Sequence, residues 1–165
     1  MSGLEAIVRN AGEGELHWFF GGGVHRWLAT TEQTGGSYLL FEDAMERGKV
    51  TPLHLHPEVE ESMIVLEGEL LMHLDGVERR VGEGGMVMVP RGMPHAFLVT
   101  SEKARILCLL TPGIGQDFYL GASEPYVEGA AHEVDFAKIA QSGRDNGGIE
   151  ILGPPPFAHL AAAPH

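Results

Sequence analysis

The stretch from Gly48 to Leu70, GKVTPLHLHPEVEESMIVLEGEL, decides how the rest of the chain is interpreted. Two histidines, His54 and His56, stand two residues apart on a predicted strand, so their side chains project from the same face. Pro57 ends that strand, and a second strand follows after a pair of glutamates. A turn between the strands brings one glutamate beside the two histidines. The stretch therefore predicts a hairpin that carries three candidate metal ligands.

A fourth candidate ligand lies in the later stretch GEGGMVMVPRGMPHAFLV, where His95 begins a predicted strand. Pro90 and Gly92 are residues typical of the tight turn that precedes it. Imidazoles combined with a carboxylate suit one divalent transition metal, which can be Ni, Mn, Fe, Co, Cu or Zn. Three histidines and one glutamate leave coordination positions for water, O2 or substrate, so the set favours a catalytic metal.

The surrounding sequence predicts a mostly β protein. Short aliphatic and β-branched runs recur between residues 37 and 110, separated by Gly, Pro and Asp-Gly turns, which is typical of an antiparallel sandwich or barrel. Asp75-Gly76 supplies the positive φ angles of a two-residue hairpin turn. One helix is expected in FAKIAQS, with Asp135 as its N-cap and Gly143 ending it in a left-handed conformation.

Composition sets the broad class of protein. The 165 residues fit one domain, and 44% hydrophobic with 21% charged residues is typical of a folded globular protein. The formal charge of −12 and the scattered basic residues argue against a nucleic-acid partner. No basic leader or long apolar run indicates export or membrane insertion, so a soluble cytoplasmic protein is expected. Cys108 is interpreted as a small buried hydrophobe.

Both metal-ligand stretches resemble the two signature motifs of the cupin superfamily. The first motif, G-x5-H-x-H-x4-E-x6-G, is matched by Gly48, His54, His56, Glu61 and Gly68. The second motif, G-x5-P-x-G-x2-H-x3-N, is matched by Gly84, Pro90, Gly92 and His95, with Val99 in place of its final Asn. The resemblance implies an all-β fold, a single cupin jelly-roll barrel with a short C-terminal helix and with the metal inside its mouth.

Under this interpretation the whole chain, 1–165, is one cupin domain. Residues 1–36 are expected to form an N-terminal arm, 37–122 the barrel core, and 123–165 the C-terminal helix and tail. The segment after the barrel, CLLTPGIGQDFYLGASEP, and the ending GPPP also resemble small single-domain bacterial cupins often likened to quercetin 2,3-dioxygenase.

The carboxylate ligand has two candidates, Glu60 and Glu61, because some cupins place it three residues after the second histidine. Glu61 keeps the spacing to Gly68 and alternates with Met63 and Val65, as residues on one face of a strand do, so it is preferred. The other histidines, including His25 and His73, have no partner at ligand spacing and are interpreted as structural or exposed. The same applies to His17, His132, His159 and His165.

The resemblance implies a metal-dependent dioxygenase that cleaves a flavonol-type aromatic molecule with O2, with Glu61 as both ligand and catalytic base. The alternatives are a metal-dependent isomerase, cyclase or lyase of a small metabolite, or a non-catalytic small-molecule-binding cupin. Apolar side chains that alternate along the strands are candidates for the substrate pocket, namely Met63, Met72, Met88 and Phe97. A homodimer is expected, in which HRWLATTEQTGGSYLLFE adds an arm to the partner's sheet.

Overall fold

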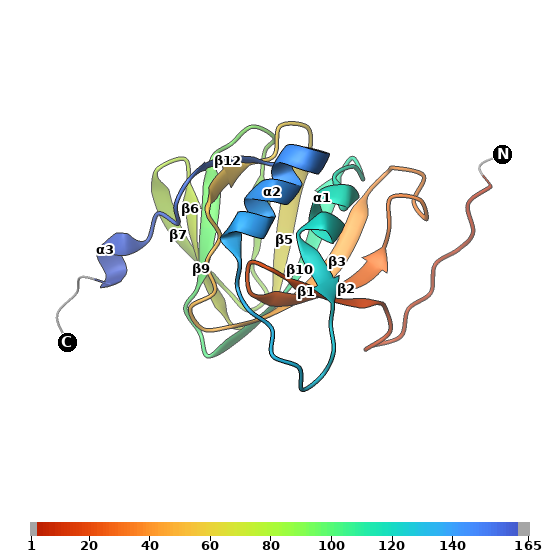
Figure 1. Ribbon diagram of the computed structural model, residues 1–165, viewed down its shortest axis with the longest axis horizontal. Coiled ribbons are helices and arrows are strands. Elements are labelled where there is room, and N and C mark those ends of the chain that lie inside the picture. The colour runs from red at the N-terminus through yellow and green to blue at the C-terminus, as the bar shows by residue number, and fades with distance from the viewer. Residues whose placement is uncertain (1–2, 162–165) are drawn as a thin grey trace.

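The computed structural model describes residues 3–161 and shows two antiparallel β-sheets packed face to face (Figure 1). The first sheet has seven strands in the order β11-β1-β2-β3-β10-β5-β8, and the second has five in the order β12-β4-β9-β6-β7. This arrangement is a jelly-roll β-sandwich, which confirms the predicted fold class. The strands are β1 Leu16–Phe19, β2 Gly23–Ala29, β3 Leu39–Glu46, β4 Leu53–Leu55, β5 Glu60–Glu67, β6 Glu69–Leu74, β7 Val77–Gly82, β8 Met86–Val89, β9 His95–Val99, β10 Lys103–Thr111, β11 Ser123–Pro125 and β12 Glu150–Gly153.

The core fills the space between the two sheets, because alternate residues of each central strand point inward. Along β10 every second side chain from Ala104 to Leu110 is buried, and along β5 Met63 and Val65 are buried while Ile64 is exposed. The sheet that carries Met72 and Val99 supplies the opposite side of the same cluster. Burial of these apolar side chains is the main force that holds the sheets together.

Local turn and cap signals are confirmed, with one exception. Asp75 and Gly76 have φ angles of 46° and 84° and join β6 to β7 with Leu74 paired to Val77. Helix α2 spans Phe136–Asn146, and the Asp135 side chain accepts hydrogen bonds from the first-turn amides. The predicted end at Gly143 is wrong, because α2 continues for three more residues to Gly147, whose φ of 67° breaks the helix.

Within the predicted N-terminal arm, 1–36, residues 16–29 are not separate from the barrel. Strand β1 pairs with β2, and β2 pairs with β3, so residues 16–29 belong to the seven-stranded sheet of their own chain. The buried residues of β2 are Gly23, His25, Trp27 and Ala29. This mixture of small, polar and aromatic residues lacks the aliphatic alternation by which the other strands were recognised. In this chain the strands of residues 25–42 pair within their own sheet, and the exchange of this arm with a partner's sheet stays a prediction.

The C-terminal region closes one end of the sandwich. Helices α1, Gln116–Gly121, and α2 lie side by side over the opening between the sheets (Figure 1), and β12 adds an edge strand beside β4. A short helix, α3, spans Ala158–Ala161. Among the described residues no helix is long and apolar enough to cross a membrane. His165 lies outside the described residues.

Candidate metal centre

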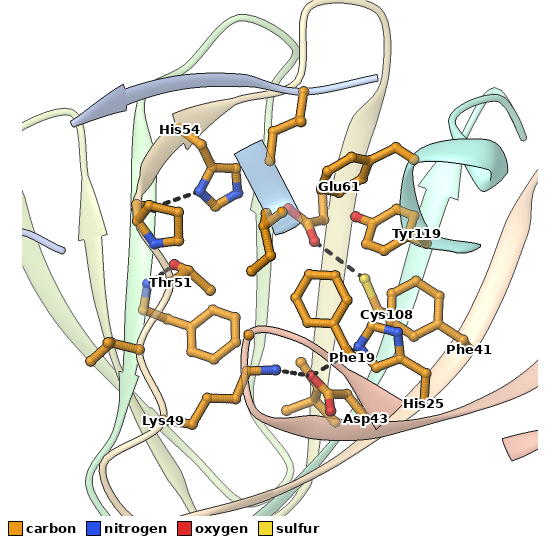
Figure 2. A pocket seen from close by; sticks show the side chains of 18 of the residues that line it. Phe19, His25, Phe41, Asp43, Lys49, Thr51, His54, Glu61, Cys108 and Tyr119 are labelled. Atoms are coloured by element: carbon orange, nitrogen blue, oxygen red, sulfur yellow. Dashed lines mark hydrogen bonds and ion pairs between the residues drawn. The ribbon is translucent and has the colours of Figure 1, made fainter. Parts of the chain in front are cut away.

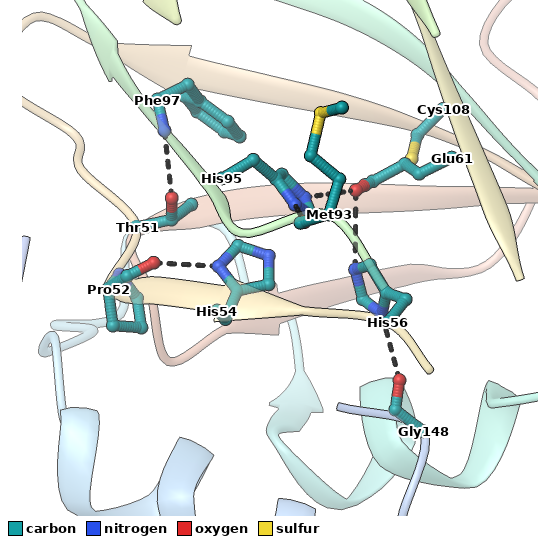
Figure 3. Close-up of polar contacts among 10 residues, drawn as sticks. All are labelled: Thr51, Pro52, His54, His56, Glu61, Met93, His95, Phe97, Cys108 and Gly148. Carbon is teal, nitrogen blue, oxygen red and sulfur yellow. Dashed lines mark hydrogen bonds and ion pairs between the residues drawn. The ribbon is translucent and has the colours of Figure 1, made fainter. Parts of the chain in front are cut away.

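Four side chains from both sheets meet at one buried point (Figure 3). His54 lies on β4, His56 lies just beyond its end, and His95 begins β9, where it pairs directly with His54. Glu61 reaches them from β5 in the opposite sheet. One ligand atom from each of the four lies within 4.8 Å of the others, and all four residues are buried. The structure thus assembles the four candidate ligands that the spacing predicts.

Glu61 rather than Glu60 belongs to this cluster. The Glu60 carboxylate points away and accepts two hydrogen bonds from the Arg91 guanidinium, at 2.6 and 2.7 Å. Successive side chains of a strand face opposite sides, so only one of two adjacent glutamates can enter the barrel. The alternation that favoured Glu61 in the sequence is the physical reason for the observed arrangement.

The orientation of the three histidines is fixed by backbone carbonyls. His54 Nδ1 donates to the Pro52 carbonyl at 2.7 Å, and His95 Nδ1 donates to that of Met93 at 2.9 Å (Figure 3). His56 Nδ1 donates to the carbonyl of Gly148, between α2 and β12, at 2.8 Å. A carbonyl oxygen only accepts, so each Nδ1 carries the hydrogen and each neutral ring keeps a lone pair on Nε2. This is the tautomer that metal-binding histidines adopt through a hydrogen-bonded outer shell.

The contacts inside the cluster fit a cation. His95 Nε2 lies 2.9 Å and His56 Nε2 3.3 Å from the same Glu61 oxygen, Oε2. Lone pairs that face one another in a buried site repel unless a proton or a metal ion lies between them. His56 Nε2 is also a buried nitrogen without a hydrogen-bond partner among the described residues. The donor set, three imidazoles and one carboxylate, is the set that divalent transition metals bind.

Burial and mutual charge interactions shift the pKa values of the clustered side chains. Burial, together with the neighbouring His95 and His56, lowers the pKa of His54 to about 3, so this ring stays neutral. Burial raises the pKa of Glu61, but the neighbouring His56 and His95 outweigh burial and hold this pKa well below the usual range. For His56 burial also opposes the charge, yet the Glu61 carboxylate raises its pKa.

The cluster opens onto a cavity of about 60 Å³ between the sheets and the two longer helices (Figure 2). His54, Glu61 and His95 form one part of its wall. The remaining wall is largely apolar and aromatic, and includes Phe19, Phe41, Phe97, Phe118, Tyr119 and Ile139. Such a wall presents apolar and aromatic surface to a ligand beside the candidate centre.

Of the four predicted pocket residues, only Phe97 lines this cavity. Met63 and Met72 are fully buried in the core but are not part of the cavity wall. Met88 is wrong for a pocket residue because its side chain is 52% exposed. It pairs with Ser62 on the outward face of β5, so the alternation of β8 turns it to the outside.

Two polar groups beside Glu61 were not predicted as site residues. The Cys108 thiol is buried and donates to Glu61 Oε1 at 3.3 Å, and burial together with Glu61 raises its pKa well above the usual value. Burial and Glu61 also keep the Tyr119 phenol protonated by raising its pKa. Cys108 was recognised as buried from its apolar run, but Tyr119 lies on α1, and no spacing in the sequence relates it to the metal motifs.

Comparisons with known proteins agree with this architecture. The family model "Cupin domain" matches residues 41–110. The quercetin 2,3-dioxygenase of Bacillus subtilis is 29% identical over 116 residues, which cover 70% of this chain and 34% of that protein. An uncharacterized protein of Aquifex aeolicus is 30% identical over 59 residues, covering 36% of this chain and 49% of that protein. The chain thus spans between about a third and a half of these curated relatives.

Solved structures show the same fold. An RmlC-like cupin from Shewanella frigidimarina superposes with a TM-score of 0.60 at 17% identity, covering 68% of this chain and 96% of the other. The polyketide cyclase RemF from Streptomyces resistomycificus gives a TM-score of 0.50 at 26% identity, covering 67% of this chain and 75% of RemF. The molecule is therefore a jelly-roll protein with a buried three-histidine, one-glutamate cluster. The part of the chain that carries all four candidate ligands matches the cupin-domain family.

Proposed function

We propose that this protein is a metal-dependent dioxygenase of the quercetinase type, which cleaves a flavonol-like aromatic molecule with O2. The observation that carries the proposal is the cluster of His54, His56, Glu61 and His95 at the wall of a largely apolar and aromatic cavity. The likeness to the quercetin 2,3-dioxygenase of Bacillus subtilis supports the aromatic substrate. Because the match covers about a third of that enzyme, the substrate rests on the cavity as much as on the likeness.

The residues of this chain would have distinct roles. The three histidines would hold a divalent transition metal, which supplies Lewis acidity that lowers the pKa of a substrate hydroxyl and provides redox capacity toward O2. Glu61 would accept the proton of that hydroxyl, since its carboxylate lies beside the three histidines and lines the cavity. The Cys108 thiol holds Glu61 Oε1, which leaves Oε2 facing the histidines.

The size of the cavity constrains the substrate. A volume of about 60 Å³ accommodates roughly four to six water molecules, at about 10–15 Å³ each. A three-ring flavonol needs more room, so its entry requires the opening covered by α1 and α2 to widen. A smaller aromatic substrate fits with less movement, and a substrate panel must therefore include single-ring phenols beside flavonols.

A second candidate function is a redox-neutral, metal-dependent cyclase, isomerase or lyase. The likeness to the polyketide cyclase RemF at 26% identity favours this class, and the same four residues would serve it. A third candidate is a cupin that binds a small molecule without turnover. Consumption of O2 separates the dioxygenase from both.

An oxygen-electrode assay tests the proposal directly. The purified protein is reconstituted separately with Mn, Fe, Co and Ni and is then given flavonols and single-ring phenols. We expect O2 uptake with at least one metal, lost in His54→Ala and retained in His73→Ala, since His73 lies outside the cluster on β6. Turnover of an aromatic compound without O2 uptake would transfer the assignment to the cyclase class. Tight binding with no turnover of any compound would leave only the binding function.

A further inference from the structure

A second polar cluster lies inside the same cavity, away from the candidate metal ligands (Figure 2). Lys49 Nζ donates to Asp43 Oδ2 at 2.6 Å, and His25 Nε2 lies 3.5 Å from the same oxygen. The three side chains come from β2, β3 and the segment after β3, and are 9%, 3% and 2% exposed for Lys49, Asp43 and His25. Buried charges carry a large desolvation cost, so their presence in a cavity wall calls for an explanation.

The hydrogen-bonding capacity of this cluster is only partly used. Asp43 Oδ1 and His25 Nδ1 are buried atoms with no partner among the described residues. The Lys49 ammonium has three N–H donors, and Asp43 Oδ2 is the one acceptor that the described residues give it. A pair that served only to tie two strands together would be expected to satisfy both carboxylate oxygens. The Asp43 carboxylate thus has one oxygen, Oδ1, that can still accept a hydrogen bond, and the Lys49 ammonium has N–H groups that can still donate.

The backbone keeps space for this cluster. Gly23 lies against it, and a Cβ at this position would collide with Asp43 Oδ1 and would lie 2.9 Å from Lys49 Nζ. The first of these contacts involves a short side chain anchored on a central strand, which cannot swing away. Glycine at position 23 thus allows the carboxylate and the ammonium to be buried side by side.

Aromatic rings connect this cluster to the candidate metal centre. Lys49 Nζ lies 5.3 Å from the ring centroid of Phe19 and 5.5 Å from that of Phe97, and both rings line the cavity. His25 stacks on Phe19 with centroids 4.7 Å apart. The cavity therefore has a metal-binding group of residues in one part, a lysine–aspartate pair in another, and aromatic faces between them (Figure 2).

We propose that Lys49 and Asp43 form a recognition subsite for a phenolic hydroxyl on the part of the substrate remote from the metal. A phenol matches the free positions, because its oxygen can accept from the Lys49 ammonium while its hydrogen is donated to Asp43 Oδ1. The substrate class is then an aromatic molecule with one oxygen function for the metal and a hydroxyl on a distant ring position. This inference rests on the proposed function for the metal end of the substrate.

The test compares two probes that differ by one hydroxyl, 3-hydroxyflavone and 3,4′-dihydroxyflavone. Binding to the Zn-loaded protein is measured by calorimetry, since zinc supplies no redox chemistry and both probes persist. We expect the dihydroxy probe to bind at least about tenfold more tightly, as a charge-assisted hydrogen bond allows. Lys49→Met alone leaves the Asp43 charge buried and unpaired, so the main variant is Lys49→Met/Asp43→Leu, which removes both charges.

In the double variant the preference for the dihydroxy probe over 3-hydroxyflavone is expected to fall to within about twofold. Lys103→Met, which removes an exposed lysine on β10, should keep the full preference. A double variant that keeps the preference, or a wild-type protein that shows none or binds neither probe, overturns the inference. Oxygen uptake is scored separately, so a preserved preference without uptake refutes only the dioxygenase, and uptake without the preference refutes only the subsite.

Discussion

Gly148→Ala tests whether the outer shell of the cluster positions its ligands. The Gly148 carbonyl accepts from His56 Nδ1 at 2.8 Å, and its φ is 80°. A Cβ there would lie 3.3 Å from Gly115 Cα and from Phe118 Cβ, so the segment must shift away from α1. Such a shift moves the carbonyl and releases the His56 ring. Loss of an outer-shell hydrogen bond of this kind lowers metal affinity about 10–100-fold.

Gly147→Ala is the matched control. Gly147 has a φ of 67°, but a Cβ there meets nothing within 4 Å, and no hydrogen bond joins its carbonyl to a candidate ligand among the described residues. Each variant should lose about 1–3 kcal/mol of unfolding free energy from backbone strain. Only Gly148→Ala should lose zinc affinity, measured by competition with a chromogenic chelator, with folding checked by circular dichroism. Equal zinc affinities in the two variants would refute the reasoning.

Three further predictions concern other parts of the molecule. Burial, opposed by Asp43, lowers the pKa of His25 in the folded protein. As pH falls below the unfolded pKa near 6.5, the unfolded chain therefore binds a proton before the folded protein does, and the free energy of unfolding decreases. His25→Gln has no such titration. The unfolding free energy of the wild type minus that of the variant, measured with urea, should therefore decrease by up to about 1.4 kcal/mol between about pH 7.5 and 5.5, and a constant difference would contradict the prediction. The homodimer stays a prediction. Met86 and Met88 expose apolar surface on edge strand β8, so Met88→Glu should convert dimers to monomers in analytical ultracentrifugation. A monomeric wild-type protein would contradict the predicted dimer. The buried Cys108 thiol, with its raised pKa, should resist iodoacetamide in the folded protein and react only after denaturation, and rapid labelling of native protein by mass spectrometry would contradict its burial.

The sequence predicted the part of the site that depends on local spacing. His54 and His56 share a face because they are two residues apart, and Glu61 enters the barrel because strand side chains alternate. The turn at Asp75 and the cap at Asp135 are equally local, and both are confirmed. These features follow from backbone periodicity and from the conformational preferences of single residues.

Features set by long-range packing were not predictable in this way. The carbonyl that orients His56 belongs to Gly148, 92 residues away, and nothing in its own sequence signals the contact. His25 was interpreted as structural or exposed, because its register opposite Asp43 appears only once β2 pairs with β3. Met88 was assigned to the pocket because alternation defines two faces of a strand but does not say which one is inside.

The central claim is that His54, His56, Glu61 and His95 hold a metal ion. Elemental analysis of the purified protein, after incubation with divalent transition metals and removal of excess ions, tests it most directly. The account predicts about one bound metal ion per chain, lost in His54→Ala and kept in His73→Ala. A folded wild-type protein that retains no metal, or a His54→Ala variant that retains as much as the wild type, would contradict it.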